Sequence, residues 1–423
     1  MNKVNFAGQL LIVMLITLIC GCPALAQNQD TTSTSRDSEL KQGKLYITPL
    51  PAIASNPTSG FIYGVAASAG MYLGEPDDTR ISSAFLAFTY STKEQLALIL
   101  KSNVFSNKEK WNLLGDWRYL VTNQPTYGLG TGPQSAKPIG EGIEINGVKG
   151  RPDLDDQLMY FNLLRFHETA FRKVKNNFYL GLGYHLDYHF NIDDVELDLS
   201  TNDGDGVKYT SHYKYSVENG FDPEKYILSG VSLNAAYDSR DNAINPYSGM
   251  YSLLTFRINP TFLGSDANST SLWAEFRDYY NLSKNRPRHL IALWAFTHIQ
   301  TSGTHPYMNL PAIGWDVYGR SGRAYTQGRF RGEKIGYAEL EYRVPLPPII
   351  KKYPELFGLV AFVNATTASS KPAGIKFMEY IDPAAGVGLR FMLNTKSRAN
   401  VTIDYAWGRY GERGLYFNLN ETF

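Results

Sequence analysis

The chain ends in Leu415-Tyr-Phe-Asn-Leu-Asn-Glu-Thr-Phe423, a stretch in which apolar and polar side chains largely alternate. In an extended strand, Leu415, Phe417, Leu419 and Phe423 fall on one face, and Tyr416, Asn418, Asn420 and Thr422 fall on the other. An apolar face that runs to a terminal aromatic residue is typical of a strand with lipid on one side and a wet lumen on the other. The ending therefore predicts an all-β fold, a transmembrane antiparallel β-barrel that this strand closes.

The first 26 residues have the pattern of a secretory signal peptide. Lys3 precedes an apolar run at 10–19 that is too short to span a bilayer, and Ala24-Leu25-Ala26 forms a small-x-small cleavage site. The residues before Cys22 also loosely resemble a lipobox, so acylation of Cys22 is the alternative to cleavage after Ala26. We expect a signal peptide at 1–26, a disordered periplasmic segment at 27–43 and a single outer-membrane barrel domain at 44–423.

Charge and cysteine content exclude several classes of function. The chain has 41 basic and 40 acidic residues, and loss of the leader removes only Lys3, which leaves 40 of each and no net charge. This balance gives no electrostatic basis for binding nucleic acid. Both cysteines, Cys20 and Cys22, lie in the leader, so the exported chain has no disulfide and no thiol chemistry.

From about residue 44 onward, the sequence repeats a unit of alternating residues followed by a break. About sixteen strands are expected, an even number, as in bacterial single-chain barrels. Pro49 and Pro51 interrupt the first, because proline cannot donate to a ladder. The expected strands are 45–54, 60–73, 81–91, 95–105, 111–121, 158–171, 178–190, 227–238, 250–259, 271–282, 289–300, 335–346, 357–365, 384–393, 400–407 and 415–423.

The connections between these strands alternate in length. The long ones, 122–157, 191–226 and 301–334, all belong to one of the two alternating sets. Outer-membrane barrels have short periplasmic turns and long outer loops, so this parity predicts that both termini are periplasmic. The other set is 74–80, 106–110, 172–177, 239–248, 283–288 and 394–398, with the proline-rich 347–355 as an unusually long turn.

Several short segments, in the right order, resemble the bacterial surface antigen superfamily of outer-membrane barrels, which includes BamA and TamA. Tyr-Asp-Ser-Arg-Asp at 237–241 and Asn-Pro-Tyr-Ser-Gly at 245–249 resemble a turn of that family. Arg323-Ala-Tyr325 and the following Gly328, Arg329, Phe330 and Arg331 resemble its long inner loop, and 341–343, 362–364 and 385–390 resemble the strands that follow. The resemblance covers 227–423, and the C-terminal Leu415, Phe417, Leu419 and Phe423 resemble the signal read by the barrel-assembly machinery.

This sequence departs from the family pattern in three ways. Family members that insert or export proteins carry periplasmic POTRA domains, for which we expect no room before this barrel. Ala324 replaces the glycine of the inner-loop motif, where a positive φ would be strained. Asn364 stands where the family usually has an aspartate paired with the loop arginine.

Charged residues in the last strands are predicted to face the lumen, because a lipid-facing Arg or Lys near mid-bilayer costs about 2–4 kcal/mol. They alternate with apolar side chains and are Glu339, Glu341, Arg343, Arg390 and Asp404. The segment 301–334 is long enough to fold inward as a plug, and the resemblance implies that Arg323 pairs with Glu339 or Glu341. The alternative is a solvated outer loop with scattered arginines.

A catalytic or metal site has weak support. The candidate for an outer-membrane hydrolase is His212 with Asp193, Asp194 or Ser211. A calcium-like segment at 202–206 lacks the glutamate that a calcium loop requires at its twelfth position. We therefore expect no enzyme activity, no metal and no cofactor.

The resemblance implies protein or lipid translocation or assembly at the outer membrane of a Gram-negative bacterium, with a weak seam between the first and last strands as the route. The competing class is a passive channel or receptor. The expected partners are outer-membrane lipid and, during biogenesis, the barrel-assembly machinery; a periplasmic partner in trans stays open.

Overall fold

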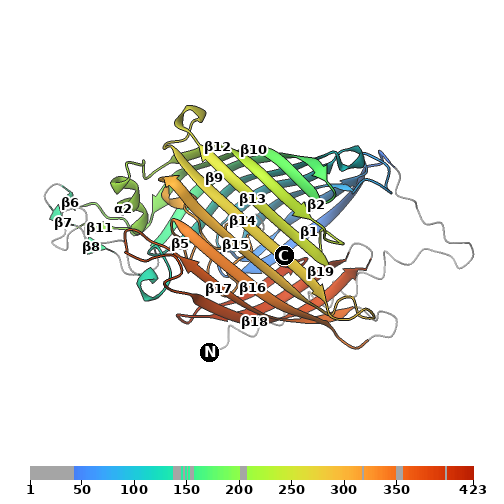
Figure 1. Cartoon of the computed structure of the whole chain (residues 1–423). Helices are drawn as coiled ribbons and strands as arrows, with labels where there is room; N and C mark the ends of the chain where they lie inside the picture. Colours follow the sequence, from blue (N-terminus) through green and yellow to red (C-terminus); the bar gives the residue numbers. More distant parts are fainter. Residues whose placement is uncertain are drawn as a thin grey trace, which may run out of the picture. The chain divides into compact units, whose positions relative to one another are not determined.

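The structure, a computed structural model, describes residues 42–136, 144–145, 148–149, 151–152, 157–200, 207–316, 319–348, 356–395 and 398–423. Sixteen antiparallel strands close into one barrel (Figure 1). The predicted fold class and strand number are confirmed. The predicted signal peptide and nearly all of the 27–43 segment lie outside the described residues.

Each barrel strand pairs with the next along the chain, so the sheet is a simple meander. Long strands of alternating side chains produce this topology, because every backbone group finds a partner on an adjacent strand. The strands are β1 (Tyr46–Asn56), β2 (Gly60–Met71), β3 (Ser82–Ser91), β4 (Leu96–Phe105), β5 (Trp111–Thr126), β9 (Gln157–Lys175), β10 (Phe178–Asp194), β12 (Tyr226–Asp238), β13 (Gly249–Asn259), β14 (Ser269–Asn281), β15 (Leu290–Gly303), β16 (Lys334–Pro345), β17 (Phe357–Ala368), β18 (Asp382–Asn394), β19 (Ala399–Gly408) and β20 (Arg413–Leu419).

The long connections, between β5 and β9, β10 and β12, and β15 and β16, all leave the same end of the barrel, here called the long-loop end. They carry the short strands β6 (Glu144–Ile145), β7 (Val148–Lys149), β8 (Arg151–Pro152) and β11 (Lys208–Tyr209) and the helix α2 (Ser211–Glu218), on the left in Figure 1. The side chain of Thr210 caps α2 by accepting from the amide of Tyr213 at 3.0 Å. The opposite end is the short-turn end.

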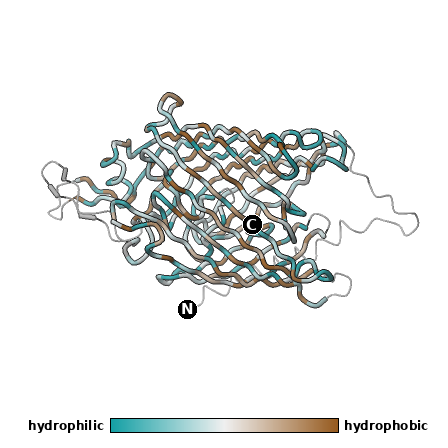
Figure 2. The backbone as a smooth tube through the Cα atoms, in the orientation of Figure 1, coloured by the Kyte–Doolittle hydropathy of each residue, from teal (hydrophilic) through white to brown (hydrophobic). Residues whose placement is uncertain are grey.

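The two faces of each strand differ as the alternation predicted. In β16, Leu340 and Tyr342 are exposed on the outer wall, whereas Glu339, Glu341 and Arg343 are buried in the lumen. Apolar positions recur along the strands of the wall in Figure 2. In a membrane protein this exposed apolar wall is the lipid-contacting surface.

Packed side chains fill much of the lumen. One apolar cluster joins Trp294 and Phe296 of β15 and Tyr337 of β16 to Phe330 of the β15–β16 connection. A second cluster, which includes Phe161, Tyr215 and Tyr307, packs nearer the long-loop end. The β15–β16 connection contributes to both, so it crosses a large part of the lumen.

The prediction for the chain's end was wrong in one respect. We predicted a strand to Phe423 with that ring on the lipid face, but β20 ends at Leu419 and the backbone turns at Asn420, whose φ is +66°. The last residues enter the lumen, where Phe423 is 5% exposed. Asparagine tolerates the left-handed conformation better than most residues, which permits this turn after Leu419.

Among the described residues, no helix is long and apolar enough to cross a membrane.

The expected orientation can be tested by labelling on intact cells. A cysteine replacing exposed Asp222, in the β10–β12 connection, should react with a membrane-impermeant maleimide added outside. A cysteine replacing exposed Asn107, in the β4–β5 turn, should react only after the outer membrane is opened. The reverse pattern of labelling would place the short-turn end outside the cell.

Candidate functional site

The connection between β15 and β16, residues 304–333, is here called the inner loop because its tip lies inside the barrel. Its backbone is fixed at points far apart in the sequence. Ala324 donates its amide to the Tyr416 hydroxyl of β20 at 2.9 Å, and Gln327 donates its amide to the Thr58 hydroxyl between β1 and β2 at 2.9 Å. The Tyr325 hydroxyl donates to the Pro383 carbonyl of β18 at 2.6 Å. The inner loop therefore ties several strands together from inside.

Arg323 forms the centre of the site. Its guanidinium donates to Glu339 at 2.7 Å, to Asp404 at 2.9 Å and to Glu341. The guanidinium also lies over the Phe362 ring, 3.5 Å from its centroid. All of these side chains are buried, so the arginine is held by a three-carboxylate cage on β16 and β19.

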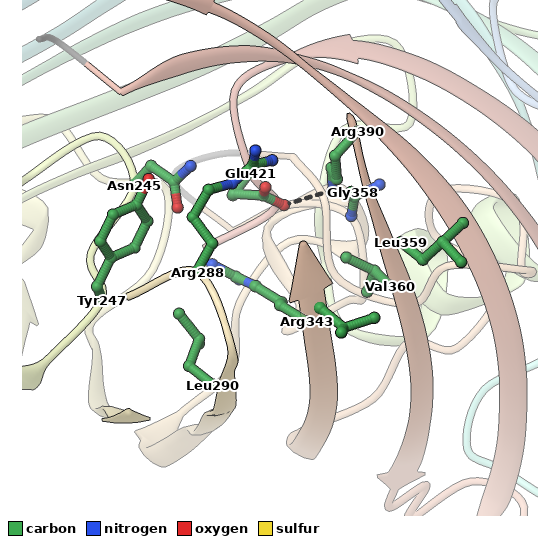
Figure 3. Close-up of a pocket in the computed structure, with 11 residues that line it drawn as sticks. Asn245, Tyr247, Arg288, Leu290, Arg343, Gly358, Leu359, Val360, Arg390 and Glu421 are labelled. Atoms are coloured by element: carbon green, nitrogen blue, oxygen red, sulfur yellow. Dashed lines mark hydrogen bonds and ion pairs between the residues drawn. The ribbon is translucent and has the colours of Figure 1, made fainter. Parts of the chain in front are cut away.

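The cage continues toward the short-turn end through two more arginines. Arg343 donates to the second oxygen of Glu341 at 2.7 Å, and Arg390 donates to Asp404 at 2.5 Å and to Glu421 at 2.7 Å. Figure 3 shows Arg343, Arg390 and Glu421 around one small pocket, with the Arg390–Glu421 contact drawn as a dashed line. Cations and anions thus alternate through the lumen, an arrangement that lets each buried charge keep a partner.

The two positions that depart from the family pattern have distinct roles. Ala324 has a φ of +100°, so the expected positive φ is present and its Cβ makes that conformation strained. Asn364 does not contact the Arg323 guanidinium; its amide donates to the Arg323 carbonyl at 3.0 Å and to Glu339 at 3.4 Å. Asn364 therefore positions the loop backbone, whereas Asp404 takes the carboxylate role.

The rest of the inner-loop motif anchors the loop at the long-loop end. Arg329 donates to Glu412 at 3.2 Å and to the Ser135 hydroxyl at 3.2 Å. Arg331 donates to the Tyr307 carbonyl at 3.0 Å, and Phe330 is buried against Tyr325 with ring centroids 4.7 Å apart. Gly328 has a φ of +79°, a conformation that glycine adopts without strain.

The C-terminal residues form a tail that docks in the lumen. The Phe423 ring packs 5.3 Å from the Trp294 ring and 6.2 Å from the Tyr279 ring, between centroids. Arg343 donates to the main-chain oxygen of Phe423 at 3.2 Å, and Glu421 accepts from Arg390. The tail is thus part of the same charge network as the inner loop.

The seam where the barrel closes is its least paired junction. Between β1 and β20 the ladder joins only Ser55 and Phe417 among the described residues, whereas β1 and β2 are paired at all eleven β1 positions. Pro49 and Pro51 lie in β1 and have no amide to donate, as expected for an edge strand. Beyond the seam, Arg320 of the inner loop donates to the Leu419 carbonyl at 2.9 Å and to the Glu421 carbonyl.

The residues proposed for a hydrolase do not form an accessible catalytic site. His212 does contact Asp194, with Nδ1 2.8 Å from the carboxylate, but its Nε2 lies 3.4 Å from the Tyr226 hydroxyl. All three side chains are buried, which leaves no access for a substrate. Among the described residues, neither the Asp193 nor the Ser211 side chain forms a hydrogen bond with His212, and the calcium-like segment 202–206 lies outside the described residues. In the part of the chain that the structure describes, no group of His, Cys, Asp or Glu could hold a metal ion.

Sequence comparison places the chain in a family. The Omp85 superfamily domain matches residues 159–423, more than half of the chain, so the chain belongs to the Omp85 superfamily. Membership implies an outer-membrane β-barrel of the translocation and assembly type, in a Gram-negative bacterium. The known members of this family are translocation and assembly barrels, and they are not known to be enzymes. A sequence comparison with curated proteins gives no match.

Solved structures support the same fold. BamA from Haemophilus ducreyi, solved without POTRA domains 1-3, has 17% sequence identity and a TM-score of 0.56 over 89% of this chain and 70% of that chain. CdiB from Acinetobacter baumannii has 12% identity and a TM-score of 0.49 over 89% of this chain and 59% of that chain. The first likeness shows a shared barrel fold.

The contacts of Asn364 argue against one expectation that the family pattern raises. From the family pattern, Asn364→Asp would be tolerated or slightly stabilising. Aspartate would instead lose the donor to the Arg323 carbonyl and add a buried negative charge beside Glu339. An unsatisfied buried group costs about 1–3 kcal/mol, and more when it is charged.

We therefore expect Asn364→Asp to lower the free energy of unfolding by at least about 1 kcal/mol in urea titrations of the purified barrel. Asn234→Asp is the matched control, because the Asn234 side chain of β12 contacts Ser232 and the Thr255 hydroxyl and, among the described residues, no carboxylate. A barrel as stable as wild type, or more stable, after Asn364→Asp would show that the cage accepts a further carboxylate.

Proposed function

We propose that this protein translocates or assembles a polypeptide or lipid at the outer membrane, and that its route is the seam between β1 and β20. The single ladder pair at Ser55 and Phe417 carries this proposal. A backbone hydrogen bond contributes about 0.5–1.5 kcal/mol net, so a junction with so few of them opens at far lower cost than any other pair of strands. An unpaired strand edge accepts another strand by edge pairing.

The lumen is a poorer route than the seam. The inner loop spans the interior, and its Arg323 is held by three carboxylates on the wall. Moving the loop would break a buried charge network, which costs about 3–5 kcal/mol for each partner removed. An inner loop held inside the lumen supports a role at the barrel wall over the competing class, a passive channel or receptor.

The proposal includes the partners expected from the sequence. Outer-membrane lipid contacts the exposed apolar wall, and the barrel-assembly machinery inserts the chain during biogenesis. A periplasmic partner in trans, the remaining partner in this proposal, would deliver the substrate to the short-turn end.

A disulfide across the seam tests the route. Both native cysteines lie at positions 20 and 22, outside the barrel, so Ser55→Cys with Phe417→Cys should give one defined cross-link between β1 and β20. We expect the oxidised double variant to fail in restoring the outer-membrane protein and lipid composition of a deletion strain, and reduction to restore it. Conductance of the purified barrel should not change.

The matched control has the same residue types in a fully paired junction, Ser252→Cys with Phe276→Cys between β13 and β14. This cross-link should leave function intact, because those strands do not separate. Full function of the oxidised seam variant would contradict the seam route. Loss of conductance together with function would favour the passive channel.

A further inference from the structure

Two adjacent turns at the short-turn end carry a concentration of positive charge. The β4–β5 turn ends at Lys110, and the β9–β10 hairpin has Arg172, Lys173 and Lys175 at the end of β9. The two segments touch, because the Lys173 amide donates to the Lys110 carbonyl at 3.0 Å. These four residues are here called the cationic patch.

Little of this charge is neutralised within the protein. Glu109 accepts from Arg80 at 2.9 Å, from the Tyr179 hydroxyl at 3.0 Å and from Lys173 at 3.3 Å. Burial raises the pKa of Glu109, but hydrogen bonds and positive charge, first from Arg80, lower it overall, so this carboxylate stays ionised and is matched mainly by Arg80. Lys110, Arg172 and Lys175 have no ion-pair partner among the described residues.

Neighbouring turns at this end lack such a surplus. The β2–β3 turn is acidic, with Glu75, Asp77 and Asp78. In the β12–β13 turn, Arg240 pairs with Asp238 at 2.8 Å and Asp241 pairs with Arg398 at 2.8 Å. The cationic patch is therefore flanked by turns without such a surplus. A second basic turn, with Lys284 and Arg286 between β14 and β15, lies elsewhere on the same rim.

The sector of the cationic patch also exposes apolar side chains on the lipid-contacting wall. Trp111, the first residue of β5, is 46% exposed, and its ring lies 5.8 Å from the Arg172 guanidinium. Val174 is 60% exposed at a break in the β9–β10 register, and Phe178 opens β10 on the outer wall. Aromatic residues mark the membrane–water interface of barrels, so the cationic patch lies at headgroup depth.

We propose that the cationic patch binds the phosphate of an anionic phospholipid in the leaflet at the short-turn end. Arginine and lysine side chains at this depth attract anionic lipid headgroups electrostatically. The Arg172 guanidinium can keep its face on Trp111 while its N–H groups contact phosphate oxygens. The acyl chains of the same lipid then run along the wall above Trp111 and Phe178.

The position of the apolar residues favours lipid over an acidic protein. The cations surround side chains that already face the hydrocarbon region, so a bound headgroup stays attached to chains that gain apolar contact. An acidic soluble protein would have to leave Val174 and Phe178 uncovered or enter the membrane to cover them. This inference does not depend on the seam as the route.

Native mass spectrometry of the purified barrel with defined lipids tests the proposal. Wild type should retain phosphatidylglycerol or cardiolipin over phosphatidylcholine, and added salt should weaken this preference. The triple variant Lys110→Gln, Arg172→Gln and Lys175→Gln should lose affinity for the anionic lipids by about tenfold or more. The matched control, Lys208→Gln, Lys371→Gln and Lys376→Gln, removes three exposed lysines at the long-loop end and should bind as wild type.

Equal retention of anionic and zwitterionic lipid by wild type would overturn the proposal, and so would equal losses in the two triple variants. If the triple variant does not fold, two measurements on wild type test the site instead. One is the salt dependence of anionic lipid binding, and the other is the position at which a photoactivatable phosphatidylglycerol cross-links to the barrel. Cross-links spread evenly around the barrel would exclude a site. Either failure would leave the seam experiment unaffected, because that experiment does not measure lipid selectivity.

Discussion

The buried pairing of Arg323 with Glu339, Glu341 and Asp404 is the interaction on which the rest of the interior depends. An arginine cannot lose its proton in a protein, so a buried guanidinium needs carboxylates around it. The carboxylates in turn need cations, which Arg343 and Arg390 supply. Because the partners lie on the inner loop and on distant strands, the requirement for charge balance fixes where the loop lies.

The same network couples the inner loop to the seam. Arg320 of the loop holds the carbonyls of Leu419 and Glu421, and Arg390 of the wall holds the Glu421 side chain. The chain leaves β20 at Asn420, so the end of the last strand is bound to the loop and not to β1. Opening of the seam and movement of the loop therefore involve shared contacts. Under the proposed function, a substrate that opens the seam would therefore disturb contacts of the inner loop.

Much of the fold followed from the sequence because a strand has a period of two residues. The alternation in β16 placed Leu340 outside and Glu341 inside, and it would place every side chain on the wrong face if the register moved by one residue. The length of the connection 301–334 indicated that it could fold into the lumen. Resemblance to the family then singled out Arg323, which periodicity alone would not have separated from other loop arginines.

The failures arose where pairing between distant strands decides the outcome. Asp404 was assigned to the lumen, but nothing in the sequence showed that β19 brings it to Arg323. The spacing of Phe423 from Leu419 predicted a lipid-facing ring. The positive φ at Asn420 turns the backbone into the lumen, and the spacing of apolar residues does not reveal such a turn. Glu421 was the available signal, because a strand that continued to Phe423 would place this carboxylate on the lipid-facing side, between Leu419 and Phe423.

The central claim is that Arg323 holds the inner loop as a plug, and single-channel conductance in a planar bilayer tests it most directly. The account predicts that Arg323→Ala raises the conductance of the barrel, because the loop loses its three-carboxylate anchor. Arg257→Ala is the control, since Arg257 is a half-buried wall arginine of β13 that contacts Asp187 of β10 at 2.9 Å and, among the described residues, makes no contact with the Arg323 cage. Its conductance should stay close to wild type. Equal conductance for Arg323→Ala and wild type, in correctly folded barrels, would contradict the account.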